Sequence, residues 1–247
     1  MTTPLSQMPK PEAGQYKNDR KLFLVPTFMF PPATPKEGLE LLDRYWSEVR
    51  DHVNNLESSL GQVVRVYHEA MYVNGNDGMV ALEQLNPQGY SFIRVMIESS
   101  ATLETTEDQE ALKKTSDWQQ EASEWQRFMS FALMSQAKVA SKIAPMASEG
   151  YQESVKEYQE FNKRRYEYIG SRIDETLNEG EAGILFIQEN HQVQFPSDLQ
   201  VFYVSPPGLD AIKRWIDDQM RGFSQNTERE YDTVDNDERN TEEPKEN

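Results

Sequence analysis

Cysteine is absent from this 247-residue sequence, and histidine occurs only at positions 52, 68 and 191. The lack of cysteine excludes disulfides, thiolate nucleophiles and sulfur-ligated zinc or iron–sulfur centres. Three histidines are too few for a histidine-rich metal site, so carboxylates are the remaining protein ligands for a metal. There is also no GxxxxGK[ST] or GxGxxG phosphate loop and no GxSxG nucleophile elbow. These absences favour a protein that is not an enzyme and that binds no cofactor.

Positive charge is scarce as well. The sequence has 25 lysines and arginines against 42 acidic residues, for a formal net charge of -17. Such a chain repels phosphate backbones and anionic lipid surfaces, which disfavours nucleic acid and membranes as direct partners. The most basic segment is Lys163–Arg165, with Arg172 nearby. We interpret it as the solvated face of a helix.

No apolar run approaches the roughly 18 residues that a membrane span needs. The run at 22–30 resembles a signal peptide, but about twenty residues precede it and Pro26 interrupts it. We therefore expect a soluble cytoplasmic protein. Residues 1–19 are predicted to be a flexible arm, 20–221 a single α/β domain, and 222–247 a disordered acidic tail.

Alternation of strand-like and helix-like segments predicts an α/β fold in the first part of the chain. A strand is expected at 22–30. Thr34, Pro35 and Glu37 then begin a helix that ends at Gly61. Further strands are expected at 63–67 and 91–98, with a short helix through Met79, Leu82 and Leu85 between them.

The alternation stops from about 106 to 179, where aromatic residues recur at helical spacing. This segment predicts a long antiparallel helical hairpin, with its break at Ser148–Gly150. Strands resume at 184–187 and 201–204, and Pro206 and Pro207 open a last helix. The predicted fold is a layered mixed or parallel sheet of about five strands with the hairpin inserted.

Two short segments carry candidate catalytic residues. His68 and Glu69 follow a strand, where a histidine beside a carboxylate suits a general base or half of a metal site. His191 lies in the loop before the last strand with Asp198, whose carboxylate could pair with the imidazole and fix its tautomer. The favoured interpretation is that these side chains only bridge and cap backbone, and the catalytic assignment is the alternative.

An acidic cluster is the candidate metal site, because Mg²⁺ and Mn²⁺ take oxygen ligands. Its members are Glu98, Glu104, Glu107 and Asp108. The favoured interpretation is a helix cap, in which Thr106 begins a helix and the acids that follow offset the positive end of its dipole.

The segment 180–187, GEAGILFI, is followed by His191 and then by PSDLQV at 196–201. It resembles a GExGILFI…H…PxDIxV motif in a family of uncharacterised bacterial proteins, which implies kinship and no activity. A weaker similarity links the region to the C-terminal domain of archaeo-eukaryotic release factors. The chain lacks their Gly-Gly-Gln tripeptide, so peptide release is not implied.

The sequence favours a non-enzymatic interaction or regulatory module that contacts a protein partner, an assembly or a second copy of itself. It would use the hairpin or the loop that holds His191 and Asp198. The alternative is a small-molecule-binding protein or hydrolase with a pocket at the sheet edge around His68 and His191. A third interpretation is a ribosome-associated, release-factor-like protein without peptide-release activity.

Overall fold

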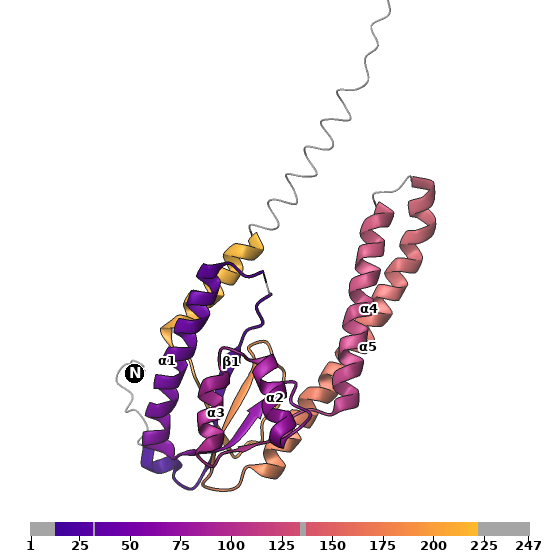
Figure 1. Cartoon of the computed structure of the whole chain (residues 1–247). Coiled ribbons are helices and arrows are strands. Elements are labelled where there is room, and N and C mark those ends of the chain that lie inside the picture. The colour runs from indigo at the N-terminus through magenta and orange to yellow at the C-terminus, as the bar shows by residue number, and fades with distance from the viewer. Residues whose placement is uncertain (1–12, 32, 134–136, 222–247) are drawn as a thin grey trace, which may run out of the picture. The chain divides into compact units, whose positions relative to one another are not determined.

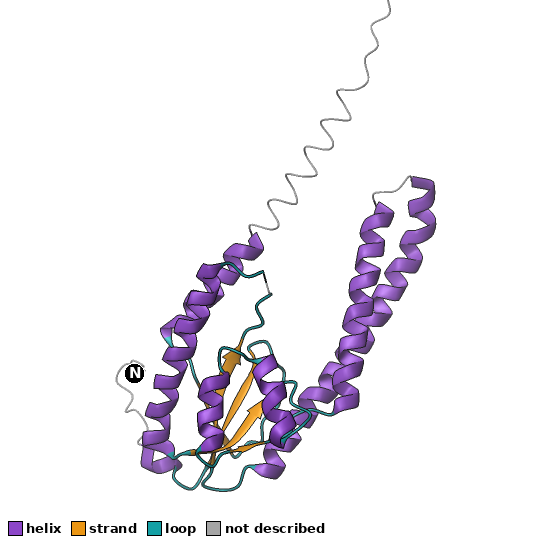
Figure 2. Ribbon diagram, viewed as in Figure 1, coloured by secondary structure: helices purple, strands orange, loops and turns teal. Residues whose placement is uncertain are grey.

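A computed structural model describes residues 13–31, 33–133 and 137–221, so the predicted tail and most of the predicted arm lie outside the described residues. Within it, five strands form one sheet in the order β3-β2-β4-β1-β5, and every neighbouring pair is parallel (Figures 1 and 2). The strands are β1 (Arg20–Thr27), β2 (Val63–His68), β3 (Thr102–Leu103), β4 (Ala182–Gln188) and β5 (Leu199–Tyr203). The predicted α/β fold is confirmed.

The chain divides into two compact units. The first contains residues 1–29 and 52–204, and therefore the whole sheet. The second contains residues 30–51 and 205–247, with the boundary inside helix α1 (Lys36–Leu60). Its described part joins the first turns of α1 to a helix at 207–221. A Cβ on Gly38 would lie 2.6 Å from the Trp215 ring, so the close approach of these two segments requires glycine there.

The sheet interior is built by the central strands. β4 is buried from Ala182 to Ile187, and β1 from Arg20 to Pro26. Such continuous burial is typical of a parallel sheet that is covered on both faces. One face packs against the end of helix α5, where Ile169, Ile173 and Leu177 join Leu22 and Leu185 in the core.

The first strand begins with two buried cationic residues, Arg20 and Lys21. Lys21 is 1% exposed, and its ammonium group donates to the carbonyls of Tyr16, Asp19 and Gly180 at 3.0–3.2 Å. Tyr16 ends the short 3-10 helix η2 (Ala13–Tyr16), so residues just before the sheet supply part of the site that holds this ammonium. Burial lowers the pKa of Lys21.

Helices α2 (Gly75–Leu85) and α3 (Tyr90–Glu98) connect β2 to β3. The predicted strand at 91–98 is therefore wrong. Its β-branched and aromatic residues favour a strand locally, yet the buried side chains are Phe92, Ile93 and Met96 while Val95 is 59% exposed. That spacing buries one face of a helix, and tertiary burial overrides the local preference.

The hairpin between β3 and β4 consists of α4 (Gln109–Leu133) and α5 (Ala137–Thr176), which run side by side in opposite directions (Figure 1). The insertion is confirmed, but the predicted break at 148–150 is wrong, because α5 continues through it. Gly150 serves packing instead: a Cβ there would lie 2.4 Å from the Trp125 ring. No helix in the described residues is both long and apolar enough to cross a membrane.

Candidate functional site

Three adjacent strands end at one cavity. Thr27, His68 and Gln188 are the last residues of β1, β2 and β4, and all three line a cavity of about 180 Å³. We call it the strand-end cavity. Helix α4 and the C-terminal end of helix α2 supply most of the remaining wall of the cavity. The other lining residues are Phe28, Met29, Glu69, Ala70, Leu85, Asn86, Leu112, Thr115, Ser116, Gln119 and Arg165.

Glu69, Glu107 and Arg165 form a buried cluster beside the cavity, the strand-end network. Arg165 donates from Nε to Glu107 Oε2 at 3.0 Å and from Nη2 to Glu107 Oε1 at 2.5 Å. Its Nη2 also lies 3.5 Å from Glu69 Oε1. The second oxygen of Glu69 accepts from the backbone N–H of Gln188 at 2.9 Å. The cluster thus joins helix α5 to the ends of β2 and β4 and to the segment before α4.

Burial and pairing act in opposite directions on these charges. Burial raises the pKa of Glu107 above its ordinary value, although Arg165 pulls it down. Burial acts to lower the pKa of Arg165, but its hydrogen bonds to the Glu107 carboxylate and the charge of that group raise it above the ordinary value. Two carboxylates share one guanidinium, so the network carries a formal charge of minus one. A buried charge cluster of this kind is costly to break from either side.

His68 is 5% exposed and is held in one tautomer. Its Nδ1 lies 2.6 Å from the carbonyl oxygen of Glu69, which can only accept, so Nδ1 carries the proton. Its Nε2 then accepts from the Asn86 amide at 3.3 Å. Burial lowers the pKa of His68 to about 4. At neutral pH this imidazole is uncharged, with both ring nitrogens engaged by the protein.

The possible pairing of His191 with Asp198 is not formed, because Asp198 is bound by Arg20. Asp198 accepts two hydrogen bonds from Arg20, at 2.9 and 2.8 Å, and the same guanidinium also binds Asp174. This lowers the pKa of Asp198. His191 is half-buried, accepts from the Val193 N–H at 3.3 Å, and burial lowers its pKa. Neither side chain lines the strand-end cavity, whereas His68 and Glu69 both do. His191 is still near enough to Glu69 for the charge of that carboxylate to oppose the effect of burial on its pKa.

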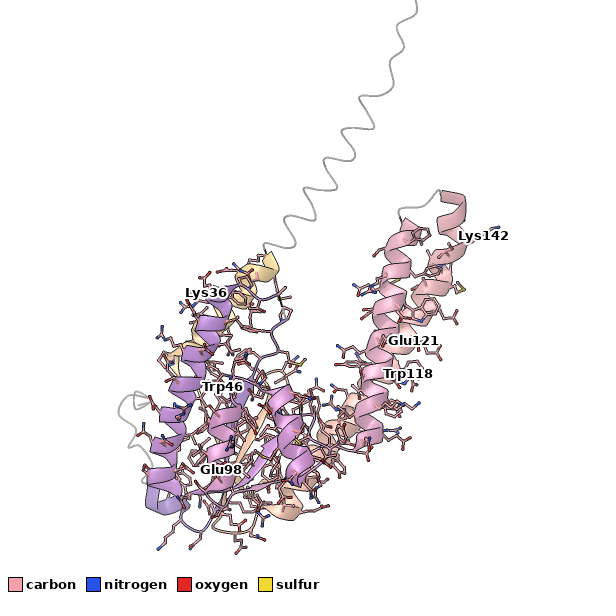
Figure 3. All side chains as sticks on the ribbon, viewed as in Figure 1. Lys36, Trp46, Glu98, Trp118, Glu121 and Lys142 are labelled. Atoms are coloured by element: carbon pink, nitrogen blue, oxygen red, sulfur yellow. The ribbon has the colours of Figure 1, made fainter. Side chains whose placement is uncertain are left out.

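The four candidate metal ligands do not converge. Glu98, which is labelled in Figure 3, pairs with Arg94 on the surface of α3. Glu104 pairs with Arg65 at 2.6 Å, and Glu107 belongs to the strand-end network. In the described part of the chain, no group of three or more acidic or histidine side chains is placed to hold a metal.

Asp108 supplies the cap that the sequence assigned to Thr106. Its Oδ1 accepts from the Ala111 N–H at 2.8 Å in the first turn of α4. The Thr106 hydroxyl instead donates to the carbonyls of His68 and Met71, and so fastens the chain after β2. The helix cap is present, but it is supplied two residues later than expected.

Arg165 is the residue that the sequence reading missed. Lys163 and Arg164 are exposed, as expected of a solvated face, whereas Arg165 is 7% exposed. The signal was available in the helical spacing: Arg165 is followed by the buried Tyr166 and Ile169, so it lies at the edge of the inward-facing stripe. Nothing in the sequence indicated its partners, which lie 58 and 96 positions earlier.

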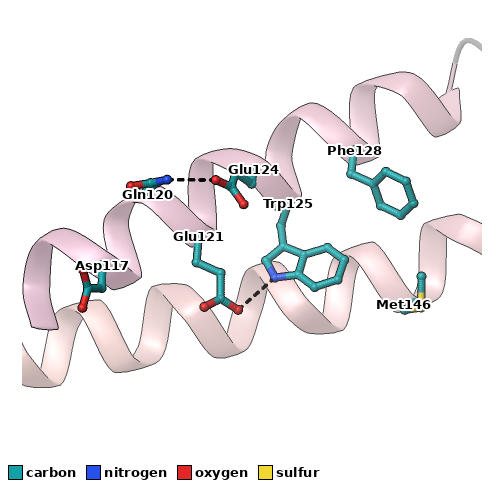
Figure 4. A pocket seen from close by; sticks show the side chains of 7 residues that line it. All are labelled: Asp117, Gln120, Glu121, Glu124, Trp125, Phe128 and Met146. Carbon is teal, nitrogen blue, oxygen red and sulfur yellow. Dashed lines mark hydrogen bonds between the residues drawn. The ribbon is translucent and has the colours of Figure 1, made fainter.

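A second candidate site lies on the hairpin, where a groove of about 700 Å³ runs along α4 and α5 (Figure 4). We call it the hairpin groove. Its apolar residues are Trp125, Phe128 and Met146, the last of them 54% exposed. Its polar residues are Asp117, Gln120, Glu121 and Glu124. In Figure 3, the labelled Trp118 and Glu121 mark the stretch of α4 concerned.

The groove has two chemically different ends. On α4 the acids Asp117, Glu121 and Glu124 come before Trp125 and Phe128, so carboxylates line one end and aromatic rings the other. Trp125 is fixed in place, because its Nε1 donates to Glu121 at 3.3 Å and its ring lies against Gly150. None of the described lining residues is basic.

Comparisons with protein-family models, curated proteins and solved structures find no match to this chain. The similarity to bacterial proteins and the weaker one to release factors therefore stay predictions. Function has to be argued from the two sites themselves.

Proposed function

We propose that this protein is a non-enzymatic interaction module whose hairpin groove binds a basic, amphipathic segment of a partner protein. The observation that carries the proposal is the groove itself, an aromatic floor with three carboxylates and no described basic residue in its wall. Apolar anchors inside a polar rim are the arrangement that concentrates binding energy at protein interfaces.

The apolar floor suits a large side chain of the partner. Trp125 and Phe128 are half-buried and Met146 is exposed. Tryptophan, phenylalanine and methionine are enriched where proteins bind one another. Methionine also adapts its shape to different guests. A leucine, phenylalanine or methionine from the partner would fit here and would exclude water from the rings.

The carboxylates select the charge of the partner. Lysine or arginine side chains near Asp117, Glu121 and Glu124 would be attracted, while phosphate groups would be repelled. This charge preference favours a protein segment over RNA as the partner. It therefore disfavours the ribosome-associated alternative, to the extent that such a protein has to contact RNA. The formal net charge of -17 likewise disfavours a second copy of this chain as the occupant.

The spacing of the two ends sets the length of the partner segment. Glu121 and Phe128 are seven residues apart on one helix, which is about 10 Å along the axis at 1.5 Å per residue. In a partner helix, a basic residue and its apolar anchor would therefore be separated by about two turns. A helix laid in a groove with such spacing is a common mode of recognition.

The alternative of a hydrolase around His68 has less support. A general base needs a free ring nitrogen and a pKa near the working pH. The ring nitrogens of His68 are both hydrogen-bonded, and burial lowers its pKa to about 4. Asp198 is bound by Arg20, and neither it nor His191 lines the cavity that holds His68.

The test uses a fluorescein-labelled, 15-residue amphipathic helix with lysines on one half of its face and leucine and phenylalanine anchors on the other. Binding to the full chain is followed by fluorescence anisotropy at low and physiological salt. We expect a micromolar Kd that weakens about tenfold or more when Glu121→Lys and Glu124→Lys are combined. The matched control combines Glu149→Lys and Glu153→Lys, the same charge change at exposed positions of α5 outside the groove.

A second peptide, with glutamates in place of the lysines, makes the result decisive. It should bind the Glu121→Lys, Glu124→Lys variant better than the unmodified chain. If both double variants weaken binding equally, only the overall charge matters and the groove is not the site. If neither peptide binds the unmodified chain, the proposal fails.

A further inference from the structure

The strand-end cavity lies where the chain reverses its direction across the sheet. From β2 the chain moves outward to β3, whereas from the neighbouring β4 it crosses β1 to reach β5. Because crossovers between parallel strands are right-handed, connections in opposite directions leave on opposite faces of the sheet. A crevice then opens between β2 and β4 at their carboxyl ends, which is where open α/β sheets bind ligands.

The polar side chains on the walls of this cavity differ in how fully they are engaged. His68, Glu69 and Arg165 are already hydrogen-bonded to protein groups. By contrast, four lining side chains form no hydrogen bond within the described residues through their own polar groups, although water can reach them. They are Thr27, Ser116, Gln119 and Gln188. Two hydroxyls and two carboxamides can each donate and accept, and none is charged.

The charge behind these groups decides which ligands fit. Glu69, Glu107 and Arg165 carry a formal charge of minus one, and the neutral His68 adds none. An anion would meet that charge without a free cation among the described lining residues to offset it, since Arg165 is occupied by its two carboxylates. An uncharged ligand with donors and acceptors meets no such penalty, and it also uses both the donors and the acceptors of the four unengaged side chains, to which an ammonium group could only donate.

A second, more open pocket of about 420 Å³ adjoins the cavity. The two share Thr27, Phe28, Met29 and Gln188, and the outer pocket adds Glu189 and Asn190. The inner cavity alone is smaller than the 300–1,000 Å³ of usual ligand pockets, whereas the outer pocket falls within that range. The inner part suits the polar head of a ligand, and the outer part its body, beside the 79% exposed Met29.

Backbone strain marks the same place. Ala70 lines the cavity with a φ of 67°, a left-handed conformation that alanine rarely adopts. The conformation is held by its N–H, which donates to Glu107 Oε1 at 3.2 Å, and by the Thr106 hydroxyl on the neighbouring His68 carbonyl. Strained residues of this kind cluster at ligand sites, where the surrounding structure fixes them.

From these observations we infer that the strand-end cavity is a binding site for a small uncharged molecule bearing a carboxamide or an equivalent donor–acceptor pair. The carboxamide enters between Gln188 of β4 and Gln119 of α4, and Thr27 and Ser116 are within the same walls. The site is separate from the hairpin groove, so the failure of one assignment leaves the other standing.

The experiment titrates the ¹⁵N-labelled full chain with pairs of probes that share a shape and differ in charge: benzamide with benzoate, and nicotinamide with nicotinate. Amide chemical shifts of Ala70, Gln188 and Gln119 report on the cavity. A probe of about nine heavy atoms should bind with a Kd on the order of 1 mM. Each carboxylate should bind about tenfold or more weakly than its carboxamide.

Two variants locate the binding. Gln119→Trp places a large side chain at the mouth of the cavity from an exposed position of α4, and should abolish the shifts. Lys113→Trp is the control, also exposed on α4 but outside the cavity lining, and should leave them unchanged. Three results overturn the inference: no shift with either carboxamide, a carboxylate that binds as well as its carboxamide, or shifts that survive Gln119→Trp.

Discussion

The strand-end network and the hairpin groove each contain acidic side chains, but the two sets differ in burial and in whether a cation of the protein pairs with them. Glu69 and Glu107 are 8% and 3% exposed and share Arg165. Asp117, Glu121 and Glu124 are exposed, and none of the described lining residues of their groove is basic. The network has its counter-charge inside the protein, whereas the groove leaves its counter-charge to be supplied from outside.

This difference separates residues that hold the fold from residues that remain available for binding. A buried carboxylate with its partner removed loses both pairing and hydration, so its neighbours are hard to change. An exposed carboxylate is hydrated whatever its neighbours do, and contributes little to folding. Substitutions in the two regions should therefore differ in size and even in sign.

The largest effect is expected from Arg165→Met. It leaves two buried carboxylates without a cation and should lower the free energy of unfolding by about 3–5 kcal/mol. Arg164→Met is the matched control one residue earlier, where an exposed pair with Glu160 is lost and the change should stay below about 1 kcal/mol. Urea denaturation at pH 7 measures both. Equal effects at the two positions would mean that the network contributes no more than a surface ion pair.

The second prediction concerns the loss of stability at acidic pH that His68 causes. The folded pKa of His68, about 4, lies below its ordinary value of 6.5, so the unfolded chain takes up the proton first as pH falls. The stabilising contribution is complete above about pH 6.5 and is lost as pH falls through 4, by roughly 3 kcal/mol in all. Denaturation of the chain and of His68→Gln between pH 7 and 4 isolates this contribution. Parallel pH profiles would contradict it.

Gly150→Ala tests whether the floor of the groove is rigid. Alanine is the better helix former by about 1 kcal/mol. Its Cβ, however, would lie 2.4 Å from the Trp125 ring, and overpacking costs about 1–3 kcal/mol. We expect a net destabilisation of about 1 kcal/mol in thermal or urea unfolding, with weaker peptide binding because Trp125 moves. A more stable variant with unchanged binding would show that the ring yields freely.

The smallest effect on stability is expected from Glu121→Gln, which should raise the free energy of unfolding instead of lowering it. Asp117 and Glu121 are four residues apart on α4, and like charges at this spacing destabilise a helix by about 0.2–0.5 kcal/mol. Glu121→Gln keeps an oxygen for the Trp125 N–H, so it should stabilise the fold by a few tenths of a kcal/mol while weakening the basic peptide. Differential scanning calorimetry and anisotropy measure the two effects. Loss of stability would place Glu121 with the structural acids.

The sequence predicted those elements whose burial pattern and local preference agree. Four of the five strands were expected near their observed positions, as was the helix from Lys36, because continuous apolar runs and capping residues act locally. The strand expected at 91–98 failed because helical burial outweighed β-branched composition. The break expected at Gly150 failed because that glycine makes room for a tryptophan ring 25 positions earlier.

The candidate site was predictable only in part, for a similar reason. His68 and Glu69 could be placed at a strand end from the sequence alone. Arg165 could not be assigned to them, since the hairpin that returns it to the sheet closes a loop of 96 residues. Asp198 was assigned to the nearest histidine along the chain, whereas its partner is Arg20, 178 positions away. Side-chain pairing at such separations is set by the topology of the sheet.

That topology also determines when each strand meets its partners during synthesis on the ribosome. β1 lies between β4 and β5, and both of its partners are made last. The ribosome adds about 155 residues between the end of β1 and the start of β4, which takes roughly 8–30 s at 5–20 residues per second. Throughout that interval the apolar strand β1 lacks both of its native partners, so the growing chain carries an unpaired and aggregation-prone segment until β4 and β5 have been made.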